Sequence, residues 1–122
     1  MLFELENRDD VCIIRIKGRL ATGADNDYLA IKAREIKSQG CRKIVADICE
    51  LDSIGSAGIG FFVDLLTSTT KDGAGCFVLA GPSPRVLEVL TLTGLSTIIP
   101  IATDLADGLA FCARKRAKHT SP

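Results

Sequence analysis

Hydrophobic and polar positions follow two different periods along this chain. Some segments are short and mostly apolar, or alternate in polarity, which is typical of strands in a partly buried sheet. In others, apolar residues recur every three or four positions, which is typical of amphipathic helices. The predicted strands lie at residues 2–5, 11–17, 43–48, 76–80 and 98–101, and the predicted helices begin near residues 25, 57, 84 and 104. Residues 49–60 follow neither period, so we expect a sharp turn there before the next helix. Ser83 and Thr103 are the predicted N-caps of the last two helices.

The order of these elements predicts a single α/β domain. The predicted order is β-β-α-β-α-β-α-β-α, and alternating strands and helices require right-handed crossovers and a mostly parallel sheet. Because a short turn joins the first two strands, we expect that pair to be antiparallel. We expect the second strand to end at Gly18. The predicted domain covers residues 1–113, and the basic segment 114–122 is predicted to be a frayed C-terminal tail.

Composition excludes several classes of protein. The chain has 122 residues, of which 47% are hydrophobic, and its 15 basic residues balance 15 acidic ones. Intrinsic disorder and nucleic-acid binding through an overall basic field are therefore not expected. The five cysteines include no closely spaced pair, so we expect reduced, buried thiols. With no signal peptide in residues 1–10 and no apolar run that could cross a membrane, the predicted location is the cytoplasm.

Candidate catalytic residues are scarce. The only histidine, His119, lies in the predicted tail, so a nucleophile paired with a histidine base is not expected. The glycine-rich run at 55–60 lacks the lysine of a phosphate-binding loop. Asp47 lies in an apolar strand, as the acceptor of a receiver domain does, but we expect it to accept backbone hydrogen bonds from the loop that follows. The sequence therefore predicts no enzyme activity, no metal and no cofactor.

Ser56 is the main candidate for a functional side chain. It lies between Gly55 and Ala57 at the predicted start of a helix, where serine is a favoured N-cap. The alternative is that Ser56 is a phosphorylation site, because a helix N-terminus accommodates negative charge. Phosphorylation would add about −1.5 to −2 charges. Spacing alone leaves both interpretations open.

The segment from Leu51 to Val63, LDSIGSAGIGFFV, resembles the signature of the STAS domain in bacterial anti-sigma factor antagonists. That signature is Asp-Ser-Ser/Thr-Gly-Leu-Gly followed by an apolar helix. The resemblance extends to the run 18–20 before the first helix, to 45–47 and to 95–99. It implies a mixed sheet with helices packed mainly on one face.

The resemblance also implies a regulatory function. Such an antagonist captures an anti-sigma factor, which is a serine kinase, and so releases a sigma factor for transcription. Phosphorylation of a serine at the helix start inactivates the antagonist, and a serine phosphatase reverses this. We expect no direct DNA contact, no membrane span and at most weak nucleotide binding. The alternative is a STAS scaffold without phosphorylation, or a subunit of a transporter complex.

Two registers place the implied phosphorylation site at different serines. We choose Ser56, because Ser56-Ala57-Gly58-Ile59-Gly60 leads directly into the apolar helix, and Ser53 is the alternative. In the chosen register the family's aspartate is replaced by Gly55 and its second hydroxyl residue by Ala57. The predicted partner-binding residues are Asp52, Ser53, Gly55, Ser56, Ala57 and Gly58, with the segment 19–25 as a further contact region.

Overall fold

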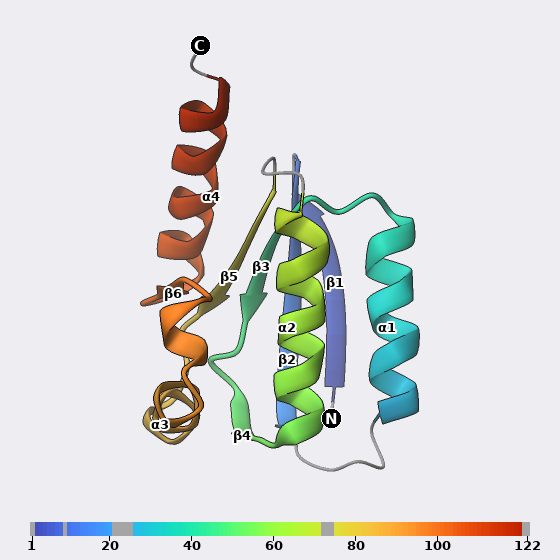
Figure 1. The fold of residues 1–122 in the computed structure, drawn as a ribbon, viewed down its shortest axis with the longest axis vertical. Coiled ribbons are helices and arrows are strands. Elements are labelled where there is room, and N and C mark those ends of the chain that lie inside the picture. Colours follow the sequence, from blue (N-terminus) through green and yellow to red (C-terminus); the bar gives the residue numbers. More distant parts are fainter. Residues whose placement is uncertain (1, 9, 21–25, 72–74, 121–122) are drawn as a thin grey trace.

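Strands and helices alternate along most of the chain and build one mixed sheet (Figure 1). The structure is a computed structural model that describes residues 2–8, 10–20, 26–71 and 75–120, without the side chains at positions 2, 20, 26 and 114–120. Within these residues the sheet has six strands in the order β1-β2-β3-β5-β6, and β4 pairs with β2 outside this path. The strands are β1 (Leu2–Arg8), β2 (Val11–Leu20), β3 (Lys43–Asp47), β4 (Leu51–Ile54), β5 (Cys76–Ala80) and β6 (Ile101–Ala102). The helices are α1 (Asn26–Ser38), α2 (Ser56–Thr70), α3 (Pro84–Leu92) and α4 (Leu105–Thr120), with a 3-10 helix, η2, at Leu95–Thr97.

The pairing of the strands confirms the predicted fold class. Strand β1 is antiparallel to β2, and the other pairings in the described residues are parallel. The sheet is therefore mixed and mostly parallel. Parallel neighbours require helical crossovers, which α1, α2 and α3 provide.

Strand β2 pairs with two parallel strands in succession. Residues 11–15 lie beside β3, and from Gly18 onward β2 lies beside β4. The register shifts between Gly18 and Arg19, where Gly18 has a φ of 90°. Glycine adopts this conformation without steric cost, so it permits a bulge that redirects the strand. The expectation that the strand ends at Gly18 is therefore wrong, since the strand continues to Leu20.

Each face of the sheet has its own hydrophobic core. The larger core contains residues of α1, α2 and α3, including Phe62, whose ring centroid lies 6.0 Å from that of Phe77 in β5. The smaller core lies on the other face, where α4 packs against residues such as Val45 and Val78. The helices thus lie mainly on one face, as the family resemblance implied.

Two predicted segments differ from the structure. Residues 49–60, expected to turn without regular structure before the helix, contain the short strand β4. The last strand, predicted at 98–101, is only Ile101–Ala102. Its first residues instead complete the turn of η2, because the backbone N–H groups of Ile98 and Ile99 both donate to the carbonyl oxygen of Leu95.

The predicted helix caps are partly confirmed. Ser83 caps α3, with the N–H of Val86 donating to its Oγ at 3.3 Å. At α4, the expected cap was Thr103, but the N–H of Asp107 donates to Oδ1 of Asp104 at 2.8 Å. Thr103 lies one residue further out and donates its own N–H to Asp107 at 3.0 Å. The N-cap of α4 is therefore Asp104, one residue nearer the helix than Thr103.

Helix α4 continues to Thr120, into the segment predicted to be a frayed tail. Residues 121–122 and the side chains of 114–120, including His119, lie outside the described part of the structure. The proposed domain boundary at residue 113 therefore stays a prediction.

The cysteines are paired, which corrects the expectation of five reduced thiols. Cys12 forms a disulfide with Cys41, and their Cα atoms are 6.0 Å apart. Cys76 forms another with Cys112, with Cα atoms 6.4 Å apart, whereas Cys49 is free and exposed. The partners are 29 and 36 residues apart in the sequence, so only the fold brings them together.

We predict that the disulfides add measurably to stability in protein purified without reductant. Intact mass should be lower than that of the reduced chain by four hydrogen atoms. Cys41→Ser should lose about 2–4 kcal/mol of unfolding free energy, because the unfolded chain regains the freedom of a long loop. Thermal unfolding should report this loss as a lower midpoint, and Cys49→Ser is the matched control. Equal midpoints for the two variants would contradict the prediction.

Candidate functional site

Ser56 lies at the corner between β4 and α2. Gly55 is the N-cap of α2 in extended backbone, and Ser56 is the first helical residue. The interpretation of Ser56 as the N-cap is therefore wrong by one residue. No side chain caps the helix, and Ser56 is exposed. Its hydroxyl group is thus available to a partner instead of being committed to the backbone.

The first turn of α2 is electrostatically suited to an anion. The backbone N–H groups of its first residues have no partner within the helix. The first intrahelical bond runs from the N–H of Ile59 to the carbonyl oxygen of Gly55, at 3.0 Å. No acidic residue occupies this first turn. The partial positive charge of the helix end is therefore not offset by a local carboxylate.

A groove between α1 and α2 begins at Ser56. It encloses about 220 Å³. Residues 56, 57, 60, 61 and 64 contribute its α2 side, and their spacing places them on one face of the helix. Its α1 side consists of Leu29, Ala30 and Ala33. The groove is therefore apolar along its length, with the serine hydroxyl at one end.

Small residues keep this groove open, and an ion pair closes its far end. A Cβ atom added at Gly60 would meet nothing within 4 Å, so the glycine leaves free space instead of relieving a clash. Lys37 of α1 donates to both carboxylate oxygens of Asp64 in α2, at 2.9 and 3.0 Å. Phe61 forms the buried wall and packs edge-on against Phe3 of β1, with ring centroids 5.6 Å apart. The groove thus has fixed walls.

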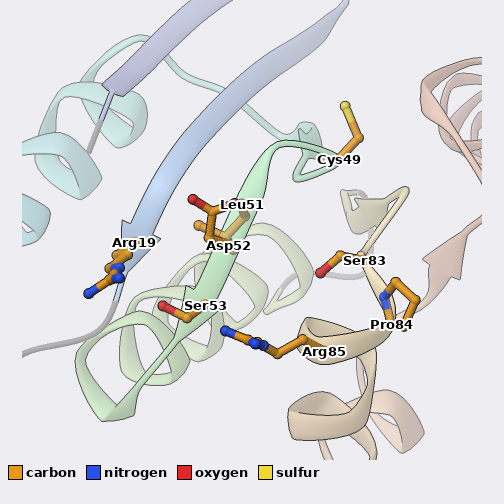
Figure 2. A pocket seen from close by; sticks show the side chains of 8 residues that line it. All are labelled: Arg19, Cys49, Leu51, Asp52, Ser53, Ser83, Pro84 and Arg85. Atoms are coloured by element: carbon orange, nitrogen blue, oxygen red, sulfur yellow. The ribbon is translucent and has the colours of Figure 1, made fainter.

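Asp52 and Ser53 line a different and larger pocket. This pocket encloses about 700 Å³ between β4 and the start of α3. Figure 2 shows Ser53 between two arginine side chains, Arg19 from β2 and Arg85 from α3. Ser53 is only half exposed. We call this the β4–α3 pocket, and its lining residues are Arg19, Cys49, Leu51, Asp52, Ser53, Ser83, Pro84 and Arg85.

The predicted site therefore separates into two surfaces. Ser56 and Ala57 belong to the α1–α2 groove, whereas Asp52 and Ser53 belong to the β4–α3 pocket. Gly58 is buried, so it does not offer the contact surface predicted for it. Of the predicted contact region at 19–25, Arg19 lines the pocket, and residues 21–25 lie outside the described part.

The expectation for Asp47 is confirmed. Its Oδ1 accepts a hydrogen bond from the backbone N–H of Cys49 at 3.3 Å. The Asp47 carboxylate also interacts with the Cys49 thiol group itself, and this interaction, together with partial burial and the charge of Asp47, raises the pKa of the thiol. Cys49 is therefore neutral at physiological pH, in spite of its exposure.

No metal site is visible in the residues that the structure describes, where no three potential ligands cluster. Within the same residues, no helix combines the length and apolar character needed to traverse a bilayer.

The amino-acid sequence of this chain matches a known protein family. The family model described as the STAS domain matches residues 3–108. The chain belongs to the STAS domain family. The mixed six-stranded sheet with four helices described above is the STAS fold.

Several relatives of this STAS domain are named as anti-sigma factor antagonists. A proposed anti-sigma factor antagonist of Thermotoga maritima is 30% identical over 116 residues, covering 93% of this chain and all of that protein. The crystal structure of a proposed Thermotoga maritima antagonist has a TM-score of 0.83 and 28% identity, covering 92% of this chain and 95% of that one. The Bacillus protein SpoIIAA, in its phosphorylated form, has a TM-score of 0.62 and 25% identity, covering 84% of this chain and 92% of that one.

Parts of both surfaces come from distant segments and were not predicted from the sequence. Arg85 and Ser83 reach the β4–α3 pocket from α3, and Ala30 and Ala33 reach the groove from α1. One signal was present for the pocket. Ligands of parallel α/β sheets bind outside the carboxyl ends of the strands, and Arg85 follows such an end. The α1 side of the groove had no comparable signal.

We predict that Asp47 controls the reactivity of Cys49. Because Asp47 raises the pKa of the thiol, the reactive thiolate is scarce at pH 8. Asp47→Asn should therefore accelerate alkylation by iodoacetamide, followed by mass spectrometry of the peptide that carries Cys49. Asp52→Asn, which removes a neighbouring carboxylate outside this hydrogen bond, is the control. An unchanged rate in Asp47→Asn would contradict the assignment.

Proposed function

We propose that this STAS domain is a partner-switching regulator of transcription. In its unphosphorylated form it binds an anti-sigma factor of the serine-kinase type and so releases a sigma factor. Phosphorylation of Ser56 by that kinase ends the binding, and a serine phosphatase restores it. The domain acts by binding and has no catalytic activity of its own.

The observation that carries the proposal is the state of Ser56. Its side chain is exposed, it does not cap the helix, and it lies at one end of an open apolar groove. A kinase needs an accessible hydroxyl, and a protein partner needs apolar surface beside it. The named relatives of this chain, including a structure of SpoIIAA in its phosphorylated form, support the same function.

We expect a phosphate on Ser56 to change the affinity for the partner more than the stability of the fold. In the free domain, a dianion at the α2 N-terminus would gain about 0.3–1 kcal/mol from the helix end. In a complex, an unpaired charge at the interface costs several kcal/mol. The domain would therefore stay folded while its affinity for the partner falls.

Ser56 suits this proposal better than Ser53. Ser53 is half-buried within β4 and faces the β4–α3 pocket. Phosphorylation there would require the kinase to reach a residue whose backbone belongs to the sheet. Ser56 requires no such rearrangement, although the family's second hydroxyl residue is replaced by Ala57 in this chain.

Location and small-molecule binding are part of the same proposal. A kinase-type anti-sigma factor works beside RNA polymerase, so we place the domain in the cytoplasm. We propose no direct contact with DNA. The glycine-rich loop lacks a lysine, so any nucleotide binding through that loop is weak.

A specific observation favours one alternative function. Ala57 removes the second hydroxyl of the family pattern, so this STAS domain could act as a scaffold, or as a subunit of a transporter complex, without phosphorylation. In that case the groove would bind its partner constitutively. The two functions differ in whether adenosine triphosphate changes the affinity.

We predict a single phosphorylation site at Ser56. Incubation with the kinase-type anti-sigma factor from the same genome and adenosine triphosphate should add one phosphate, placed at Ser56 by peptide mass spectrometry. Ser56→Ala should stay unmodified, and Ser53→Ala should be modified at the normal rate. Phosphorylation of Ser56→Ala would contradict the site, and an unmodified wild-type chain that still binds the kinase would support the scaffold.

We predict that the groove between α1 and α2 contacts the partner. Gly60→Leu places a bulky side chain in the groove, at a position where the added Cβ atom itself meets nothing within 4 Å. We expect the thermal midpoint to be preserved and affinity for the anti-sigma factor to fall about tenfold or more, which corresponds to about 1.4 kcal/mol. Thr67→Leu, an exposed position further along the same helix, is the matched control. Equal affinities of the two variants, measured by calorimetry, would exclude the groove.

A further inference from the structure

The β4–α3 pocket lies where small ligands bind in parallel α/β sheets. Cys49 follows the carboxyl end of β3, Ser83 follows that of β5, and Arg19 is near the end of β2. Ligands of such sheets bind outside these carboxyl ends. The volume of about 700 Å³ lies within the range of small-molecule sites. The proposed kinase site at Ser56 is not part of this pocket.

Neither arginine of the pocket has a side-chain partner among the described residues. Many described basic side chains pair with carboxylates, such as Lys17 with Glu50 at 3.2 Å. Within the described residues, Arg19 and Arg85 form neither an ion pair nor a hydrogen bond through their side chains. Each guanidinium therefore retains all of its donors for a ligand.

Two arginines lie on either side of one hydroxyl. Arg19 is the register partner of Ser53 in the β2–β4 pair, which fixes these residues side by side. Arg85 reaches toward Ser53 from α3, so that Ser53 lies between the two arginines (Figure 2). Ser83 accepts the N–H of Val86 and keeps its own hydrogen available as a donor. The pocket thus offers several donors around one position.

The charge of the pocket selects an anion. Two arginines face one carboxylate, that of Asp52, among the lining residues. Cys49 adds no negative charge, because Asp47 raises the pKa of its thiol. The lining therefore has a net positive charge within a domain whose formal net charge is zero.

We propose that the β4–α3 pocket binds a small phosphate monoester, with Arg19, Arg85 and Ser53 as its ligands for the phosphate group. The planar fork of each arginine matches two phosphate oxygens, and the Ser53 hydroxyl donates to a third. The pocket has room for an organic group beyond the phosphate. This site is independent of the proposed phosphorylation at Ser56.

Titration of the purified domain with inorganic phosphate and with ribose 5-phosphate tests the proposal. Both should shift amide resonances of residues 52–53 and 83–86 in a saturable way, and ribose without phosphate should not. Tighter binding of ribose 5-phosphate would show that the organic group is also recognised. Shifts that do not saturate by about 10 mM, or equal shifts with ribose, would overturn the site. No kinase is present, so this test is independent of the proposed function.

Three substitutions separate the site from general electrostatics. Arg85→Ala should lower the affinity for phosphate about tenfold, because it removes one bidentate contact. Asp52→Asn should raise the affinity, because it removes the opposing carboxylate. Arg34→Ala, at an exposed arginine of α1 that also lacks a described partner, is the matched control and should have no effect. Equal losses in Arg85→Ala and Arg34→Ala, or a weaker Asp52→Asn, would overturn the proposal, with circular dichroism as the check on folding.

Discussion

The two surfaces of this domain depend on one strand that pairs in succession with two parallel neighbours. Strand β2 leaves β3 after Arg15 and continues beside β4 only because Gly18 adopts a positive φ and shifts the register. The carbonyl oxygen of Glu50 accepts the N–H of Gly18 at 3.0 Å, which fixes the approach of β4. Strand β4 then places Ser53 beside Arg19 on one side and leads into α2 at Ser56. A residue with a Cβ at position 18 would strain this bulge, and with it both the pocket and the helix start.

The two surfaces differ in the interactions they offer. The α1–α2 groove is lined by small and apolar side chains, and its only described charged lining residue, Asp64, is neutralised by Lys37. The β4–α3 pocket instead presents two arginines whose side chains form no ion pair or hydrogen bond within the part of the chain that the structure describes. Apolar grooves favour the side chains of a protein, whereas unpaired arginines favour a small anion. Ser53 and Ser56 therefore lie in different chemical settings, although only two residues separate them in the sequence.

Local patterns in the sequence predicted the elements, and distant contacts account for what they missed. The mixed sheet and the Ser83 cap follow from periodicity and from residues next to each other in the chain. Strand β4 was missed because Asp52 and Ser53 interrupt a run of only four residues, and pairing with β2 is what makes that run a strand. The disulfides were missed for a similar reason, since the partners of Cys12 and Cys76 are distant in the sequence. The serine at the corner was found from its neighbours, but Arg85 and the α1 side of the groove come from other elements and left no local trace.

Gly55 stands where the family pattern has an aspartate, and this difference changes the electrostatics at the start of α2. An aspartate at position 55 would cap α2 through its carboxylate and place a negative charge beside the serine. Gly55 caps the helix without a side chain, at a cost of only a few tenths of a kcal/mol relative to a good capping residue. The N–H groups of the first turn then remain available, and no carboxylate repels a phosphate at Ser56. The substitution therefore favours a phosphate at this helix end, even though the chain has lost the second hydroxyl of the pattern at Ala57.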